Sequence, residues 1–183
     1  KQTSDKLKAE NNGEVINSLA FQHIIVGEIY DVLKKSDSWK PYAFKHLYNK
    51  EEYYMFDPDR VNYGTIREYP CPGYENYGQF DAMVEKGDVL GIFTGHDHTN
   101  AFAVEHKGID IVNSLSTRYI GLCHSTQCGY RVIEIEENDT STYKTRVARI
   151  YDMFDSKTVK EEKQNGDKFA YTMAREFAVK GKI

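Results

Sequence analysis

The chain contains no apolar run long enough to cross a membrane as a helix. Its longest runs, such as residues 89–94, are far shorter than the roughly 20 apolar residues that such a helix needs. Positive charge is also scarce, because 24 Lys and Arg residues face 28 Asp and Glu residues and the formal net charge is −4. General binding of nucleic acid depends on a basic surface, so we do not expect it.

Cysteine is sparse as well. Cys71, Cys123 and Cys128 cannot all pair within the chain, and their spacing does not form a disulfide framework. A reducing, cytoplasmic compartment is therefore slightly favoured. The stretch from Cys123 to Cys128, which includes His124, has an alternative interpretation as a small zinc site, although a fourth ligand and the spacing of a zinc ribbon are missing.

Several sequence signatures are missing too. The chain has no internal repeat, no glycine-rich phosphate loop and no Gly-x-Ser-x-Gly motif of a serine hydrolase. It begins with Lys1 rather than Met, and residues 1–10 read as the second half of a helix, so we expect the true N-terminus to lie upstream.

What is present is the composition of a globular protein. The 183 residues are 40% hydrophobic and 28% charged, enough for one domain of ordinary size. We place this domain at residues 1–151, followed by a polar tail at 152–183 that ends in a helix over 168–180.

Hydrophobic spacing and turn residues predict the elements of the domain. We expect helices over 1–10, 29–33 and 78–86, the last ended by Gly87. A strand over 15–22 reads as buried on both faces, and 88–94 as a second buried strand. Hairpins follow over 102–113 and 130–151, so the second half of the sheet should be antiparallel.

Residues 39–77 break this pattern. They hold all four prolines and many tyrosines, and a loop of this length in a compact domain is usually functional. The aromatic side chains either form a satellite core, which we favour, or line a pocket. They include Tyr53, Tyr54, Phe56, Tyr63, Tyr69, Tyr74 and Tyr77.

The chain is organised around residues 88–100, an apolar run that stops at Gly95 and then presents His96 and His98. A strand that ends in this way delivers two imidazoles to the edge of a sheet, where a metal ion can be held. His23 falls at the end of the strand predicted over 15–22, at the kind of edge where α/β proteins bind ligands. The alternative is that these histidines are ordinary surface or packing residues.

These two segments resemble motifs of the calcineurin-like metallophosphoesterases, in the purple-acid-phosphatase-like branch. Residues 21–23 are similar to a strand-end metal histidine of that family, and 87–100 to its closing Gly-His-x-His motif. The resemblance implies an α/β fold, the C-terminal half of a two-sheet sandwich with mixed parallel and antiparallel strands.

The resemblance also implies a function. His23 and His96 would hold one metal ion and His98 another, of the Mn, Fe or Zn type, and Asn100 is a weak substrate-pocket candidate. A hydroxide bridging the two ions would attack a phosphate ester in line, so the parent protein would be a metal-dependent phosphoesterase acting on a phosphorylated small molecule or other phosphoester.

Two departures from the family pattern qualify this. No proline follows His23 closely, and the Asp-x-His, Gly-Asp-x-x-Asp and Gly-Asn-His motifs that should precede it are absent. We therefore expect no catalytic residue in this chain, at most one weakly held ion, and little activity by itself. The exposed apolar edge would invite self-association. The alternative is a non-catalytic binding or interaction module.

Overall fold

A computed structural model describes residues 1–41, 43–57, 59–117, 128–149 and 152. This part of the chain is an α/β structure with few helices and with both parallel and antiparallel strand pairs, as the sequence predicted. Within these ranges, neither α-helix has the length and apolar character that a bilayer crossing requires. The elements in chain order are α1 (Gln2–Glu10), β1 (Ser18–Phe21), the 3-10 helix η1 (Gly27–Asp31), β2 (Leu33–Ser36), β3 (Phe44–Lys45), β4 (Tyr53–Phe56), β5 (Val61–Thr65), α2 (Gln79–Lys86), β6 (Val89–Thr94), β7 (Ala101–His106), β8 (Ile109–Asn113), β9 (Gly129–Glu136) and β10 (Asp139–Arg149).

The main sheet has five strands in the order β1-β6-β8-β7-β5. β1 pairs with β6 in parallel, and β7 pairs with β8 as the expected antiparallel hairpin. The expectation that the second half is wholly antiparallel was wrong, because β8 also pairs with β6 in parallel. The chain passes outward to β7 before returning to β8, which places the more deeply buried β8 in the middle of the sheet.

Among the described residues β1 lies at the edge of the main sheet, and the burial of its side chains shows that the expectation of burial on both faces was wrong. Its residues are half-buried or exposed, and the Phe21 side chain is 67% exposed. The apolar sequence of β1 resembles that of a central strand, but β6 covers only one of its edges. An apolar strand edge is therefore open among the described residues, as the sequence suggested.

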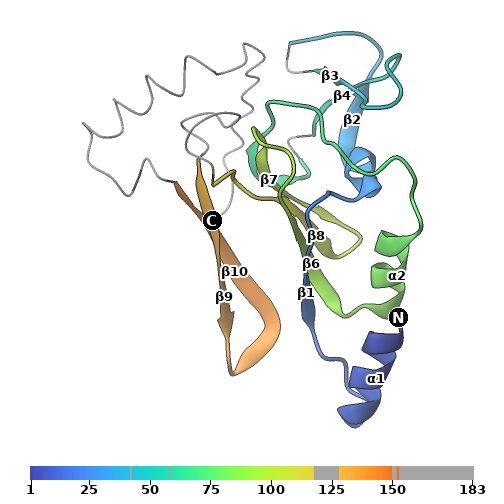
Figure 1. Ribbon diagram of the computed structural model, residues 1–183, viewed down its shortest axis with the longest axis vertical. Helices are drawn as coiled ribbons and strands as arrows, with labels where there is room; N and C mark the ends of the chain where they lie inside the picture. The colour runs from blue at the N-terminus through green and yellow to red at the C-terminus, as the bar shows by residue number, and fades with distance from the viewer. Residues whose placement is uncertain (42, 58, 118–127, 150–151, 153–183) are drawn as a thin grey trace.

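The two faces of the main sheet are covered differently, as Figure 1 shows. On one face α2 and η1 pack over the main core, where Phe80, Ile92 and Ile111 are fully buried. On the other face the β9–β10 hairpin packs against the sheet, with the rings of Phe93 and Tyr143 at 5.6 Å between centroids. Both the hairpin and α2, which ends at Gly87 with φ of 65°, were predicted from the sequence.

Residues 27–36 do not form the expected α-helix over 29–33. They form η1 and then β2, whose Leu33 pairs with Phe56 of β4 in a small sheet of order β2-β4-β3. An apolar segment of five residues does not fix its own secondary structure, and pairing with β4 decided it here.

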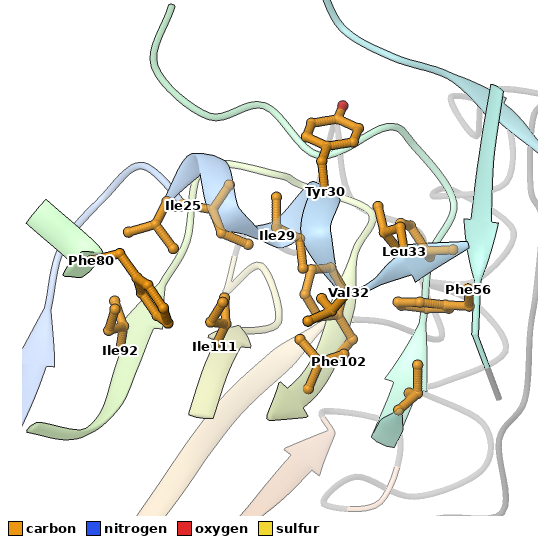
Figure 2. Close-up of a cluster of buried hydrophobic side chains, with 14 of the residues drawn as sticks. Ile25, Ile29, Tyr30, Val32, Leu33, Phe56, Phe80, Ile92, Phe102 and Ile111 are labelled. Carbon is orange, nitrogen blue, oxygen red and sulfur yellow. The ribbon is translucent and has the colours of Figure 1, made fainter. Parts of the chain in front are cut away.

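The described aromatic residues of 39–77 divide between the main core and the lining of a cleft, where Tyr48 and Tyr74 lie. Phe44 and Phe56 join the main core, where Figure 2 shows Phe56 beside Leu33, and Tyr54 packs against its border. Tyr74 and Tyr77 are instead 80% and 88% exposed. The predicted terminal helix over 168–180 lies outside the described residues, as does nearly all of the 152–183 tail.

Candidate metal centre

The parallel pairing of β1 with β6 brings His23 and His96 together. Phe21 and Phe93 are paired in register, and both chains continue past the sheet at the same edge. The backbone N–H of Gly95 donates to the carbonyl of His23 at 3.1 Å, which extends the pairing beyond the strands. As a result, Nδ1 of His96 lies 3.2 Å from Nε2 of His23, although the residues are 73 positions apart in the sequence.

The turn after β6 separates three neighbouring side chains. His96 has a left-handed backbone, with φ of 49°, which is uncommon for a residue other than glycine. Its side chain is exposed and its ring meets that of His23 edge to face, at 4.9 Å between centroids. Asp97 is buried, and His98 is exposed again. The chain therefore turns directly after β6 and gives these three side chains different environments.

Asp97 anchors the turn from inside the protein. One carboxylate oxygen accepts a hydrogen bond from the backbone N–H of Cys71 at 3.2 Å, and the other accepts one from the Asn100 amide at 3.0 Å. Burial raises the pKa of Asp97 to about 7. Both oxygens of this carboxylate are thus engaged in hydrogen bonds inside the protein.

Asn100, the pocket candidate, is only 1% exposed. Its amide oxygen accepts from the backbone N–H groups of Arg67 and Glu68, at 2.8 and 3.1 Å, and its amide nitrogen donates to the Glu68 carbonyl at 3.0 Å. Asn113 in turn donates to the Asn100 carbonyl at 2.8 Å. Sequence reasoning missed this network; its only signal was a polar Asp97–Asn100 spacing of three directly after a buried strand.

The distance between the two imidazoles fits a shared ion. Two nitrogens that each lie about 2.05 Å from one ion, at angles of 90° to 109°, are separated by about 2.9–3.3 Å. The observed 3.2 Å lies in this range. The set is small, however: among the described residues, no group of three or more His, Cys, Asp or Glu side chains is placed to hold an ion. His98 is thus not brought into the pair.

The cysteines differ from expectation. Cys128 is disulfide-bonded, whereas Cys71 is a free thiol whose pKa is raised to about 12 by burial. A disulfide sulfur is not a thiolate ligand, so the zinc interpretation of residues 123–128 loses Cys128. Cys123 and His124 lie outside the described residues.

The chain is similar to two proteins of Arabidopsis thaliana named as probable inactive purple acid phosphatases. It is 36% identical to number 14 over 70 residues, which are 38% of this chain and 18% of that protein. It is 35% identical to number 29 over 60 residues, which are 33% of this chain and 15% of that protein. The matches thus span less than a fifth of these relatives. No protein-family profile and no solved structure matches the chain.

The similarity connects the chain with the purple-acid-phosphatase-like proteins of the phosphoesterase superfamily, in agreement with the resemblance noted in the sequence. The relatives' names say nothing of a substrate, and they describe proteins that are probably inactive.

Proposed function

We propose that this protein is part of a metal-dependent phosphoesterase and that His23 and His96 together hold one divalent ion of its metal centre. The observation that carries the proposal is the 3.2 Å separation of the two ring nitrogens, which fits two ligands of one ion. The similarity to purple-acid-phosphatase-like proteins supports the same chemistry.

The place of the pair in the fold also supports the proposal. Both histidines follow parallel strands at their carboxyl ends, where α/β sheets bind their ligands. Both are exposed, so water and a phosphate ester can reach them. Hydrogen bonds of Asp97 to Cys71 and Asn100 anchor the turn that carries His96.

The residues of this chain have a limited task in such a site. A bound ion would polarise a phosphoryl oxygen and stabilise the charge that develops on it. His23 and His96 would supply neutral nitrogen donors, and the His98 side chain lies on the same exposed turn as a candidate ligand of a second ion. The substrate would be a phosphate ester.

A second candidate function is a non-catalytic one. The relatives carry the word inactive in their names, and the described residues provide two grouped imidazoles without a carboxylate. In this case the same edge would bind an ion or a partner without turnover.

Calorimetric titration with Zn²⁺ and Mn²⁺ tests the metal assignment. We expect one weak site per chain, lost in both His23→Ala and His96→Ala. His98→Ala is the matched comparison on the same turn and should leave this site intact. Two tight sites in the unaltered chain, or equal binding by all four proteins, would contradict the assignment.

Hydrolysis of an aryl phosphate, assayed with each metal, separates the two candidate functions. Turnover that is lost in His96→Ala supports the phosphoesterase. Binding of the ion without turnover in the full-length protein supports the non-catalytic function.

We also propose that the open edge of β1 mediates self-association. Phe21 is 67% exposed and stacks on Phe93 at 5.3 Å between ring centroids. Val15, Ile16 and Ile24, which flank the strand, are each more than 40% exposed. An unpaired strand with apolar flanks is a template for pairing with another chain.

A further inference from the structure

A separate cleft lies beside η1, and none of its lining residues belongs to the histidine pair. It has a volume of about 440 Å³, within the range of roughly 300–1,000 Å³ that is typical of small-molecule sites. Two kinds of side chain dominate its lining. The aromatic ones are Tyr30, His46, Tyr48 and Tyr74, and the acidic ones are Glu28, Asp31 and Asp81.

The aromatic wall is fixed in place by its own polar atoms. The hydroxyl of Tyr30 donates to the Pro70 carbonyl at 2.8 Å, and that of Tyr48 donates to the Pro72 carbonyl at 2.7 Å. Figure 2 shows the Tyr30 hydroxyl pointing away from the aliphatic core beneath the ring. Because these hydroxyls are engaged by the backbone, the tyrosines offer mainly their rings to the cleft.

The rings contact one another in series. His46 lies 4.0 Å from Tyr30 and 6.2 Å from Tyr48 between centroids, and Tyr74 meets Tyr48 edge to face at 5.1 Å. Tyr74 is 80% exposed, so it forms the outer lip of the wall. These rings line one side of the cleft, and the face of an aromatic ring is electron-rich.

The acidic side of the cleft contains a buried carboxylate. Glu28 is only 8% exposed, and one of its oxygens accepts a hydrogen bond from the Asn76 amide at 2.7 Å. Among the residues that the structure describes, no cationic side chain pairs with Glu28, although a buried carboxylate ordinarily has such a partner.

The charge of the lining leaves room for a cation. The carboxylates of Glu28, Asp31 and Asp81 line the cleft with one ammonium, that of Lys107, which lies 3.8 Å from Asp81 and is half exposed. Asp31 also lies 3.7 Å from Nε2 of His106, and Glu28 has no such neighbour among the described residues. Burial lowers the pKa of His46, so its ring is neutral at pH 7 and does not supply a second positive charge.

We infer that this cleft binds an organic cation, an alkylammonium or guanidinium group that stacks on the tyrosine rings and pairs with the Glu28 carboxylate. The inference does not depend on the phosphoesterase proposal. An anionic ligand would be repelled by the acidic lining. A metal ion is not favoured either, because the described residues place no three His, Cys, Asp or Glu side chains around one point. A neutral ligand would leave the Glu28 carboxylate uncompensated.

Titration of the ¹⁵N-labelled chain with methylguanidinium and with tetramethylammonium, followed by NMR, tests the inference. We expect saturable shifts of amides around Gly27, Gly73 and Asn76, together with upfield shifts of the ligand methyl protons caused by the aromatic rings. N-methylurea, the neutral counterpart of methylguanidinium, should bind at least tenfold more weakly.

Four variants locate the contacts. Tyr74→Leu should weaken binding by about 3- to 5-fold, the size of an exposed cation–π contact. Tyr77→Leu is the matched control, because Tyr77 is 88% exposed and does not line the cleft. Glu28→Gln should weaken binding by about tenfold or more, as for a lost charge-assisted contact. If that variant unfolds, Asp81→Asn, at a more exposed carboxylate, should still weaken binding about twofold.

A further titration distinguishes a basic side chain of a polypeptide from a free small-molecule cation. A capped Gly-Arg-Gly peptide that binds more tightly than methylguanidinium would identify a basic side chain of a polypeptide; equal affinity would identify a free amine or guanidine. Equal binding of N-methylurea, an equal loss in Tyr77→Leu and Tyr74→Leu, or no saturable shift would overturn the inference and leave the Glu28–Asn76 hydrogen bond as a purely structural contact.

Discussion

Replacing Asn100 with Ala should destabilise the protein without removing an ion ligand. The change deletes an amide that makes four hydrogen bonds at a site only 1% exposed. The backbone N–H groups of Arg67 and Glu68 would lose their acceptor, and each unsatisfied buried group costs about 1–3 kcal/mol. We therefore expect a loss of about 3–5 kcal/mol, a large part of the roughly 5–15 kcal/mol of a typical domain.

Urea unfolding followed by far-UV circular dichroism measures this loss. Asn49→Ala is the matched control, because Asn49 is exposed and its side chain accepts one weak hydrogen bond, at 3.3 Å from the Glu51 N–H. It should change the unfolding free energy by less than about 0.5 kcal/mol. Thermal unfolding of Asn100→Ala should show a midpoint lowered by about 10 °C, at roughly 2–4 °C per kcal/mol for a chain of this size.

The result also decides between two roles for Asn100. A residue that contacts substrate in a pocket would change substrate binding and leave the unfolding free energy nearly unaltered. A loss of less than about 1 kcal/mol in Asn100→Ala would refute the reasoning from its buried hydrogen bonds.

Three further predictions concern other parts of the fold. A Cβ on Gly91 would lie 2.7 Å from the Tyr143 hydroxyl oxygen, so Gly91→Ala should lower the free energy of unfolding by about 1–3 kcal/mol. Adding Tyr143→Phe should restore part of this stability. Gly73→Ala is the control and should be neutral, because no atom lies closer than 3.8 Å to a Cβ at that position. Phe21→Lys should reduce self-association in sedimentation velocity, whereas Tyr77→Lys, also at an exposed aromatic, should not. The folded-state pKa of His46 lies below the ordinary value of 6.5, so its contribution to stability is present above pH 6.5 and is lost as the pH falls below it. In urea unfolding, the free energy of unfolding of His46→Phe should fall less between pH 7 and pH 5 than that of the unaltered protein. An equal fall in both proteins would contradict the lowered pKa of His46.

Turn chemistry made several elements predictable from the sequence. Lys107-Gly108 marks the β7–β8 hairpin, residues 137–138 separate β9 from β10, and Gly87 ends α2. Each of these signals is local, because the residues that determine the turn are adjacent in the chain. The sequence also led us to expect mixed parallel and antiparallel strands, and the β1–β6 pair is parallel.

The predictions were wrong where the structure of a segment depends on residues far from it in the sequence. Whether β1 lies at the centre or the edge is set by which strands flank it, and the composition of β1 does not contain this information. Residues 33–36 became a strand because β4 pairs with them. The burial of Asn100 depends on Arg67 and Glu68, more than 30 residues upstream. Sequence spacing could place polar residues after β6 but could not show which of them turn inward.

The left-handed backbone at His96 determines how the side chains after β6 are arranged. On an extended strand His96 and His98 would point to the same side and Asp97 to the other. With φ of 49° the chain turns at His96, so this ring reaches His23 while Asp97 points inward and joins Asn100. In the proposed site these two nitrogens would fill two of at least four ligand positions, and at least two would remain for water or for donors outside these residues. An ion held there by two imidazoles alone would exchange readily, so a measured affinity for a divalent ion tests whether this turn binds metal.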